Sequence, residues 1–288
     1  MTDRPILSRP GAFDPILVVS HPRSGTHLVI DLLRRQFEST RNWRWWGLPL
    51  DHLYLNLERL ASPNRTFSNK LARKIVNRPR RALVKTHFEE DFSQSWVPEE
   101  STPPGPAWMD LLARSKVLYV VRHPMDVMVS YHQFMAGIEP AIASMSFSEF
   151  LRSPHRSGET DRLGWWQRHL IGWEARPDTL FLRYEDIVAD TDTIVDRIGL
   201  WIGEVPIKLQ PMLPPKVTSI TQTRVDRAMR LSPSSTAIVA DRMSFPAEDW
   251  SQALNDADKA WVNKRIGPLL RRFGYELSRT QASKAMPE

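Results

Sequence analysis

The sequence predicts an α/β fold in which helices cover both faces of a central, mostly parallel sheet. Short apolar runs alternate with longer amphipathic segments, which is the pattern of successive β–α units. The short runs are apolar at nearly every position, as expected for strands that are buried on both faces. Polar residues follow several of these runs directly, where open α/β sheets bind their ligands.

The first β–α unit lies at residues 16–37. Residues 16–20 form a short apolar run that ends in a polar turn, and we expect a buried strand there. Residues 21–25 have the composition of a loop. Apolar side chains then recur at helical spacing over residues 26–37, which predicts a helix with one buried face. A strand, a tight loop and a helix open a βαβ unit.

The same alternation continues along the chain. Apolar runs at 82–85, 117–121 and 179–184 predict three further strands. Pro124 is suited to the first position of a helix, and Asp126 to its first turn. Further helices are expected at 51–60, 162–173, 191–201 and 257–273, with Gly274 ending the last one, and surface loops at 99–106 and 210–216.

Length and composition indicate one ordinary globular domain. The chain has 288 residues, of which 41% are apolar and 25% charged, as in folded soluble proteins. We find no internal repeat and no clear linker, so we expect a single domain over residues 1–288. The polar residues after Leu277 predict a frayed tail at about 278–288.

Composition also narrows the partners and the compartment. With no cysteine, the chain has no disulfide framework and no thiolate chemistry. Its N-terminal residues do not resemble a signal peptide, and its apolar runs are too short to cross a membrane. We expect a soluble, cytoplasmic protein. The net charge of +6 suits a polyanionic ligand, and the densest basic run, at 73–81, is best interpreted as a solvated surface, since no nucleic-acid motif is present.

A candidate phosphate loop follows the first strand. Gly25 allows a tight turn and close approach to a phosphate, Ser24 and Thr26 supply hydroxyls, and Arg23 supplies a cation. We include His27 among the candidate ligand-binding residues. The segment lacks the first glycine and the lysine of the usual nucleotide loop, and no strand ends in a magnesium-binding aspartate. An ordinary strand-to-helix turn explains the loop about equally well.

A second candidate anion site follows the strand at 117–121. Arg122 comes at its carboxyl end, and Ser130 lies about two turns into the next helix. An arginine can bind a phosphate through two parallel hydrogen bonds. Taken alone, an ion pair between Arg122 and Asp126 is the simpler interpretation.

Taken together, the two segments resemble the nucleotide signatures of the sulfotransferase family, in its cytosolic and bacterial forms that use 3′-phosphoadenosine 5′-phosphosulfate (PAPS). The resemblance rests on residues 22–26 and on the pattern from Arg122 to Ser130. It implies a three-layer P-loop-like fold, PAPS as donor, and 3′,5′-adenosine bisphosphate (PAP) as product. The loop would hold the 5′-phosphosulfate, and Arg122 and Ser130 the 3′-phosphate. No metal is expected.

The segment Lys85-Thr-His87 resembles the family's catalytic element, which also ends a strand. The resemblance implies that His87 is the general base, a role that suits a neutral imidazole. It implies that Lys85 and Arg23 stabilise the charge that develops during transfer. The family usually has lysine where Arg23 stands, and the two are not interchangeable. Tyr184 resembles a family tyrosine that lies near the adenine.

The resemblance weakens after residue 186. Of the family's C-terminal segment over the 3′-phosphate only Asp249-Trp250 remains, and Leu28 stands near the place of its adenine-stacking tryptophan. The residues that complete the donor site stay open among four arginines: Arg224, Arg227, Arg230 and Arg242.

The acceptor is not specified by the sequence. A hydroxyl or amine on a small molecule, a sugar or a lipid fits the family, and the oligomeric state is open. Trp43, Trp45 and Trp46 could border an acceptor pocket, whereas the tryptophans at 165–173 are better explained by packing. Two other functions compete with sulfuryl transfer: a P-loop nucleotide-dependent kinase that acts on a small molecule, and a non-enzymatic protein that binds anions or nucleic acid.

Overall fold

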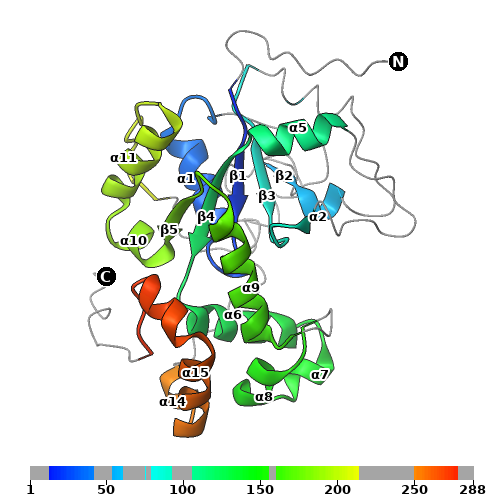
Figure 1. The fold of residues 1–288 in the computed structure, drawn as a ribbon. Coiled ribbons are helices and arrows are strands. Elements are labelled where there is room, and N and C mark those ends of the chain that lie inside the picture. Colours follow the sequence, from blue (N-terminus) through cyan, green and yellow to red (C-terminus); the bar gives the residue numbers. More distant parts are fainter. Residues whose placement is uncertain are drawn as a thin grey trace. The chain divides into compact units, whose positions relative to one another are not determined.

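The computed structural model describes residues 13–41, 54–60, 75, 79–92, 106–155, 160–213 and 250–277. The chain divides into two compact units. The sheet unit comprises residues 1–121 and 172–244, and the helical unit comprises residues 122–171 and 245–288. Both appear in Figure 1. A single domain over residues 1–288 stays a prediction.

The sheet unit is built on five parallel strands in the order β2-β3-β1-β4-β5. Every residue of β1 and β3 is buried, which explains why β1 is an apolar run without alternation. The four predicted strands are confirmed, and β2 was not predicted. The strands are β1 (Ile16–Val19), β2 (Leu55–Asn56), β3 (Leu83–Thr86), β4 (Lys116–Val121) and β5 (Leu180–Arg183).

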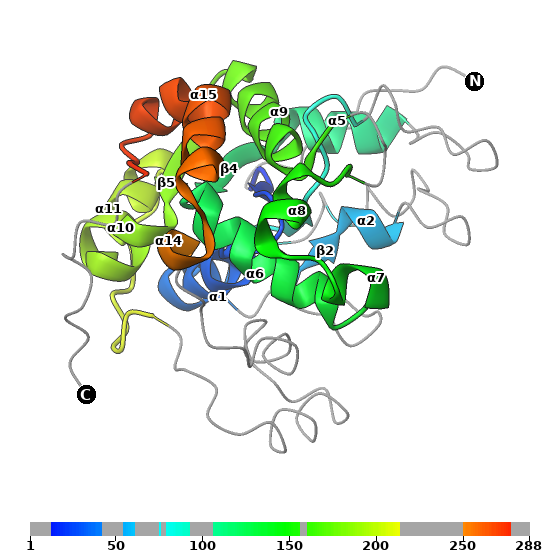
Figure 2. The ribbon, with the colours of Figure 1, turned by 90° about the horizontal axis from the view of Figure 1, so that it is seen from below.

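Helices cover the sheet from both sides. On one face, α1 (Thr26–Gln36), α10 (Tyr184–Ala189) and α11 (Thr191–Ile202) pack their apolar side chains against alternate strand residues in one buried cluster. The helix α5 (Pro106–Arg114) lies on the opposite face (Figures 1 and 2). The predicted three-layer α/β fold with a parallel sheet is therefore confirmed.

The register of the strands determines which residues meet at the carboxyl edge of the sheet. In β1, Val19 pairs with Thr86 of β3, and in β2, Asn56 pairs with Lys85 of β3. Because the strands are parallel, the residues that follow them emerge side by side. The ends of β1, β2 and β3 thus converge, and this edge carries the predicted site residues.

The helical unit contains both long helices and short ones of four to six residues. As predicted, Pro124 starts a helix with Asp126 in its first turn, and Gly274 follows the last helix with a left-handed φ of 70°. The helix α9 (Arg162–Ala175) begins in this unit and continues into the sheet unit. The other helices are α6 (Pro124–Ala136), α7 (Pro140–Ala143), α8 (Phe147–Arg152), α14 (Trp250–Ala253) and α15 (Asp256–Arg272).

Two predicted segments differ from the structure. The expected helix at 51–60 is wrong in part, because Leu55–Asn56 pairs with β3 as a strand and only α2 (Leu57–Leu60) is helical. Pairing along a neighbouring strand overrides the helical spacing there. Pro106, expected in a loop, is the first residue of α5. Residues 51–53, 99–105, 214–216 and 278–288 lie outside the described residues.

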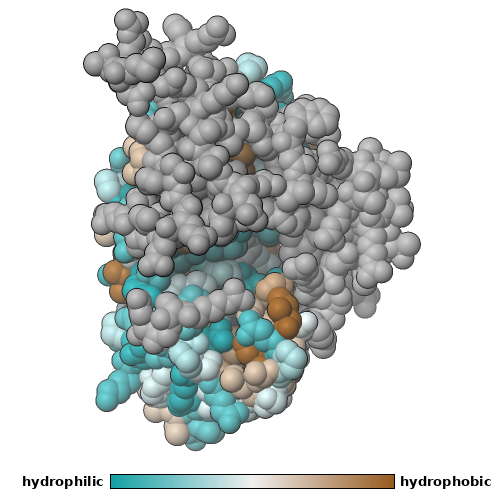
Figure 3. Space-filling view, turned by 90° about the vertical axis from the view of Figure 1, so that its right-hand side faces the viewer, coloured by the Kyte–Doolittle hydropathy of each residue, from teal (hydrophilic) through white to brown (hydrophobic). Residues whose placement is uncertain are grey.

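Within the described ranges, no helix is both long and apolar enough to cross a membrane. The surface seen in Figure 3 is mostly hydrophilic where it is coloured, with small separate hydrophobic areas.

Candidate active site

The loop between β1 and α1 has an unusual backbone. Arg23 and Gly25 both adopt left-handed conformations, with φ of 73° and 99°. The N–H of Ser24 donates to the carbonyl of His21 at 3.3 Å, and α1 begins directly after Gly25. Left-handed residues among right-handed ones turn successive N–H groups toward a common point, which makes a concavity for anions at the start of a helix.

Ser24 has the features of a ligand-binding residue. It is only 1% exposed, and its Oγ has no hydrogen-bond partner within the part of the chain that the structure describes. A buried hydroxyl without a partner costs about 1–3 kcal/mol. An oxygen of a bound phosphate would satisfy it, so the loop fits the predicted phosphosulfate group. Thr26 is engaged differently, because its hydroxyl shares a hydrogen bond of 2.5 Å with that of Ser20.

The ring of Tyr184 lies against the phosphate loop. A Cβ atom on Gly25 would lie 2.5 Å from Cδ2 of Tyr184, so the glycine is required by packing as well as by its φ. Tyr184 is the first residue of α10, directly after β5, and it also packs against the core cluster of the sheet. It forms a wall behind the loop. Its role near an adenine stays a prediction.

Lys85, Thr86 and His87 lie at the carboxyl end of β3, beside the loop that leaves β1. The Nδ1 atom of His87 lies 2.7 Å from the carbonyl oxygen of Ser20. A carbonyl can only accept a hydrogen bond, so Nδ1 carries the proton and Nε2 is the basic nitrogen of the neutral ring. This is the tautomer that a general base acting through Nε2 requires.

Glu58, in α2, is a site residue that sequence reasoning missed. Its Oε2 lies 3.3 Å from Nζ of Lys85, and its Oε1 accepts hydrogen bonds from the hydroxyl of Thr86 at 3.0 Å and from the backbone N–H of His87. Recognising β2 as a neighbour of β3 would have placed Glu58 beside His87, because Asn56 pairs with Lys85.

His27, in the first turn of α1, is held in its neutral form. Burial of the ring, followed by the positive charges of Lys85 and Arg23, lowers its pKa from 6.5 to about 3, and the carboxylate of Glu58 opposes this shift. The ring packs edge-on against Tyr54 at 5.5 Å. A neutral imidazole near Lys85 and Arg23 can donate a hydrogen bond to an anion without adding a proton equilibrium near pH 7.

The second predicted anion site belongs to the helical unit. Arg122 follows β4 directly, and Ser130 lies in α6, as the sequence predicts. Both residues are half-buried. The structure brings together Arg23, Ser24, Gly25, Thr26, His27, Lys85, His87 and Tyr184 within the sheet unit.

Other predicted candidates fall into two groups. Trp43, Trp45, Trp46, Asp249 and the four C-terminal arginines lie outside the described residues. Trp250 is 1% exposed and stacks on His123 at 5.3 Å, so it packs inside the helical unit. The tryptophans of α9 are buried, in agreement with their interpretation as packing residues: Trp165, Trp166 and Trp173.

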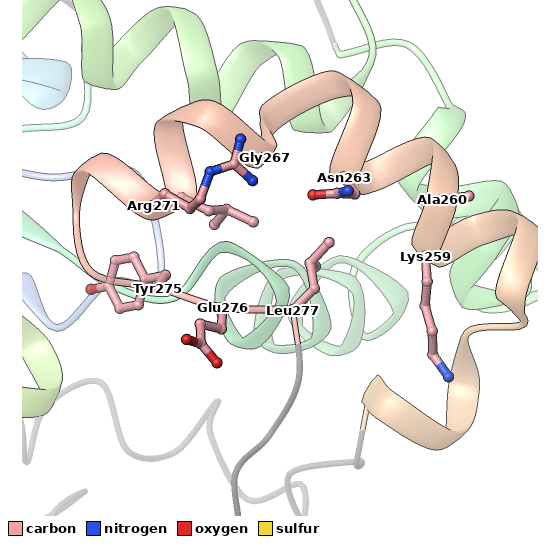
Figure 4. Close-up of a pocket in the computed structure, with 9 residues that line it drawn as sticks. Lys259, Ala260, Asn263, Gly267, Arg271, Tyr275, Glu276 and Leu277 are labelled. Atoms are coloured by element: carbon pink, nitrogen blue, oxygen red, sulfur yellow. The ribbon is translucent and has the colours of Figure 1, made fainter.

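None of the residues that line two hollows of the structure is a predicted site residue. One, of about 500 Å³, runs along α15, where Lys259, Asn263 and Arg271 line the same helix face (Figure 4). The other, of about 940 Å³, lies at the amino ends of β4 and β5. Two of its cations donate to carbonyls near helix ends, Lys116 to Trp201 at 3.1 Å and Arg176 to Leu112 at 3.1 Å. Among the residues that the structure describes, no group of three or more histidine and acidic side chains could hold a metal ion.

Comparison with known proteins gives matches along most of the chain. Human sulfotransferase 4A1 is 37% identical over 94 residues, which are 31% of this chain and 32% of the relative. Zebrafish cytosolic sulfotransferase 1 is 29% identical over 208 residues, which are 66% of this chain and 59% of the relative. The matches thus span less than two thirds of either relative.

The fold has a counterpart among solved structures. Mouse sulfotransferase SULT7A1, solved in complex with PAP, superposes with a TM-score of 0.50 at 16% identity, covering 91% of this chain and 85% of the mouse chain. A family model described as the sulfotransferase domain matches residues 13–272. Since this match takes in both the phosphate loop and the strand-end histidine, the chain belongs to the sulfotransferase family.

Proposed function

We propose that this protein transfers a sulfuryl group from PAPS to a hydroxyl or amine of an acceptor molecule. The observation that carries the proposal is the convergence of three strand ends on one site. The loop after β1 offers a buried hydroxyl and a concave backbone, while β3 delivers a cation and a histidine in its basic tautomer. An ordinary strand-to-helix turn needs neither feature.

Two groups of residues would bind the donor. Arg23, Ser24 and the N–H groups around Gly25 would hold the 5′-phosphosulfate, with Thr26 and His27 beside them. Arg122 and Ser130 would hold the 3′-phosphate, and Tyr184 would lie near the adenine. The PAP complex named for the mouse relative supports PAPS as donor and PAP as product. When bound, the donor supplies an activated sulfuryl group and leaves as PAP.

The side chains have separate tasks in the transfer. His87 accepts the acceptor's proton at Nε2, because Nδ1 is already protonated and bonded to the Ser20 carbonyl. Lys85 and Arg23 stabilise the negative charge that develops on the leaving phosphate. A sulfuryl group carries less negative charge than a phosphoryl group. These cations are therefore sufficient, and we propose that transfer needs no metal.

The acceptor class is proposed only broadly. Guinea pig relatives are named as 3-alpha- and 3-beta-hydroxysteroid sulfotransferases, which illustrates a small hydroxylated acceptor. We propose a hydroxyl- or amine-bearing small molecule, sugar or lipid, and a cytoplasmic location like that in the name of the zebrafish relative.

Calorimetric titration without added metal tests the donor site. We expect PAP to bind the wild type more tightly than ADP, because only PAP offers a 3′-phosphate to Arg122. The variant Arg122→Ala should lose this preference. Arg197→Ala, which removes an exposed arginine of α11, is the matched control and should bind like the wild type.

Binding of ADP as tight as that of PAP, or tighter in the presence of magnesium, would sink the proposal and favour a nucleotide-dependent kinase. A second assay follows transfer of ³⁵S from labelled PAPS to a panel of phenols, alcohols, amines and sugars. If the wild type binds PAP tightly but the His87→Asn variant transfers ³⁵S as fast as the wild type, the role of His87 as general base is contradicted.

A further inference from the structure

Glu58 contacts every part of the Lys85-Thr86-His87 segment, although it lies on a different strand–helix connection. We propose that Glu58 is a positioning residue for sulfuryl transfer, which holds the ammonium of Lys85 and the backbone of His87 in their working positions. This inference rests on the proposed function, because it assigns Glu58 a role in the same reaction.

The carboxylate divides its two oxygens between its partners. Oε1 accepts from the hydroxyl of Thr86 and from the backbone N–H of His87, and Oε2 lies 3.3 Å from Nζ of Lys85. All three partners are consecutive residues at the end of β3. A single carboxylate therefore fixes the strand end that carries both a charge and a base.

The ion pair with Lys85 is well shielded from water. The Lys85 side chain is 7% exposed and that of Glu58 is 27% exposed. A nearly buried ammonium is costly unless an anion is close to it, and removing one member of such a pair leaves the other charge uncompensated. Glu58 therefore keeps a cation stable at the strand end before any ligand supplies negative charge.

His87 is held from both sides by neighbouring strands. Its ring is bonded to the Ser20 carbonyl after β1, and its backbone N–H to Glu58 after β2. Loss of Glu58 would free the backbone of His87, and a mobile backbone would weaken the remaining bond of the ring to the Ser20 carbonyl. Misplacing a catalytic group by about 1 Å can cost roughly 100-fold in rate.

Two substitutions separate the two tasks. Glu58→Gln keeps an oxygen for Thr86 and His87 but presents a neutral amide to Lys85, so only the ion pair is lost. Glu58→Ala removes both contacts. Glu38→Gln is the matched control, because Glu38 also forms an ion pair, with Arg80 at 2.9 Å, but is exposed and makes none of the contacts of Glu58.

The test combines ³⁵S transfer from PAPS with ¹⁵N spectra of the histidine rings, in which His87 is identified by its loss in His87→Asn. We expect Glu58→Gln to lower kcat about tenfold with the His87 tautomer unchanged, and Glu58→Ala to lower kcat up to about 100-fold and to mix the two tautomers. Glu38→Gln should match the wild type in both measurements.

Melting temperatures separate positioning from folding. A folded Glu58→Gln protein with wild-type kcat, together with wild-type His87 spectra in Glu58→Ala, would overturn the inference. Should Glu58→Ala not fold, kcat of Glu58→Gln decides alone, and a value within twofold of the wild type overturns the inference. If the wild type itself neither binds PAP nor transfers ³⁵S, the proposed function fails, and the His87 spectra still decide whether Glu58 positions the histidine.

Discussion

Gly25 stands where backbone conformation and packing both exclude a side chain. We expect Gly25→Ala to lower the free energy of unfolding by about 2 kcal/mol or more, because alanine is strained at a φ of 99° and its Cβ would lie 2.5 Å from the ring of Tyr184. The variant should also lose PAP binding. Urea denaturation and calorimetry measure the two effects.

Gly203 provides the control for this substitution. It has a φ of 69° and nothing within 4 Å of an added Cβ, so Gly203→Ala suffers the backbone strain without the clash. The loss of stability in Gly25→Ala should exceed that in Gly203→Ala. Equal losses in the two variants would show that Tyr184 does not restrict the loop.

At the scale of single residues, the sequence predicts where the site residues lie in the fold better than it predicts which residues contact them. Lys85, His87 and Arg122 were predicted from the family resemblance together with their places at or just after strand ends, and β3 and β4 end within one residue of the predicted positions. Glu58 follows a strand of only two residues, which has no periodicity to recognise. The contact between Tyr184 and Gly25 also depends on tertiary packing, which single-sequence patterns do not report.

At the scale of elements, a buried carboxylate joins α8 to α15. Asp258 accepts hydrogen bonds from Ser148 at 2.7 Å and pairs with Arg152 at 2.6 Å. Burial acts to raise the pKa of Asp258, but its hydrogen bonds and the charge of Arg152 outweigh burial, so the pKa lies below its ordinary value. The carboxylate form is thus the one that links the two helices.

We expect Asp258→Asn to destabilise the protein at pH 7 by about 1–3 kcal/mol, since Arg152 loses the carboxylate with which it forms an ion pair. A lowered pKa means that the stabilisation is complete above the unfolded pKa of about 3.9 and is lost as the pH falls through the folded value. Urea denaturation as a function of pH should therefore show less acid sensitivity in the variant than in the wild type.

Asp256→Asn is the matched control. Asp256 lies in the same first turn of α15, but its side chain is fully exposed. Its ion pair is a long one, with Oδ1 4.0 Å from Nζ of Lys259. Its substitution should change stability by less than about 0.5 kcal/mol. A similar loss in both variants would point to a general effect of charge at the helix start instead of the link to α8.

The elements themselves were predicted unevenly. Long or strongly apolar segments such as β4 and α15 were found, because their periodicity extends over many residues. The short helices α7 and α8 were not predicted, since each spans six residues or fewer. The helix α8 begins at a capping box formed by Ser146 and Glu149, and its buried residues are Phe147, Phe150 and Leu151.

At the scale of the whole molecule, ligand binding should raise the melting temperature. A ligand that binds only the folded state adds about 2.7 kcal/mol of stability at a concentration 100 times its Kd. We expect PAP to raise the melting temperature of the wild type, and to raise that of Ser24→Ala by less at the same concentration. Thermal unfolding measures both shifts. Without ligand, Ser24→Ala should be at least as stable as the wild type, because it removes a buried hydroxyl that has no partner among the described residues.

Unchanged or higher stability without ligand, combined with a smaller response to PAP, is expected only for a hydroxyl that binds the ligand. Ser115→Ala is a suitable comparison, because the Ser115 hydroxyl is also buried but already donates to the carbonyl of Leu111 at 2.8 Å. That variant should lose stability without ligand and keep the full response to PAP. A Ser24→Ala protein that behaves like Ser115→Ala would contradict the assignment of Ser24 to the donor site.

The overall architecture was easier to predict from the sequence than the individual elements or the contacts of single residues. Apolar runs without alternation, joined by amphipathic helices, leave a parallel sheet covered on both faces as the simplest solution. The order of the strands was not predictable in the same way, because it depends on which strand ends and connections fit together in space. The placement of β2 at the edge beside β3 is the part of that order that matters for the site.

The conformation of Arg23 has an evolutionary consequence. A left-handed φ of 73° suits asparagine or glycine better than arginine, so selection for stability alone would replace this residue. In the proposed function, this conformational cost is offset by the fixed positive charge that Arg23 brings to the loop. Directed evolution for heat resistance should therefore converge on Arg23 as a stabilising target, and under the proposed function the variants chosen that way would be more thermostable but slower in sulfuryl transfer.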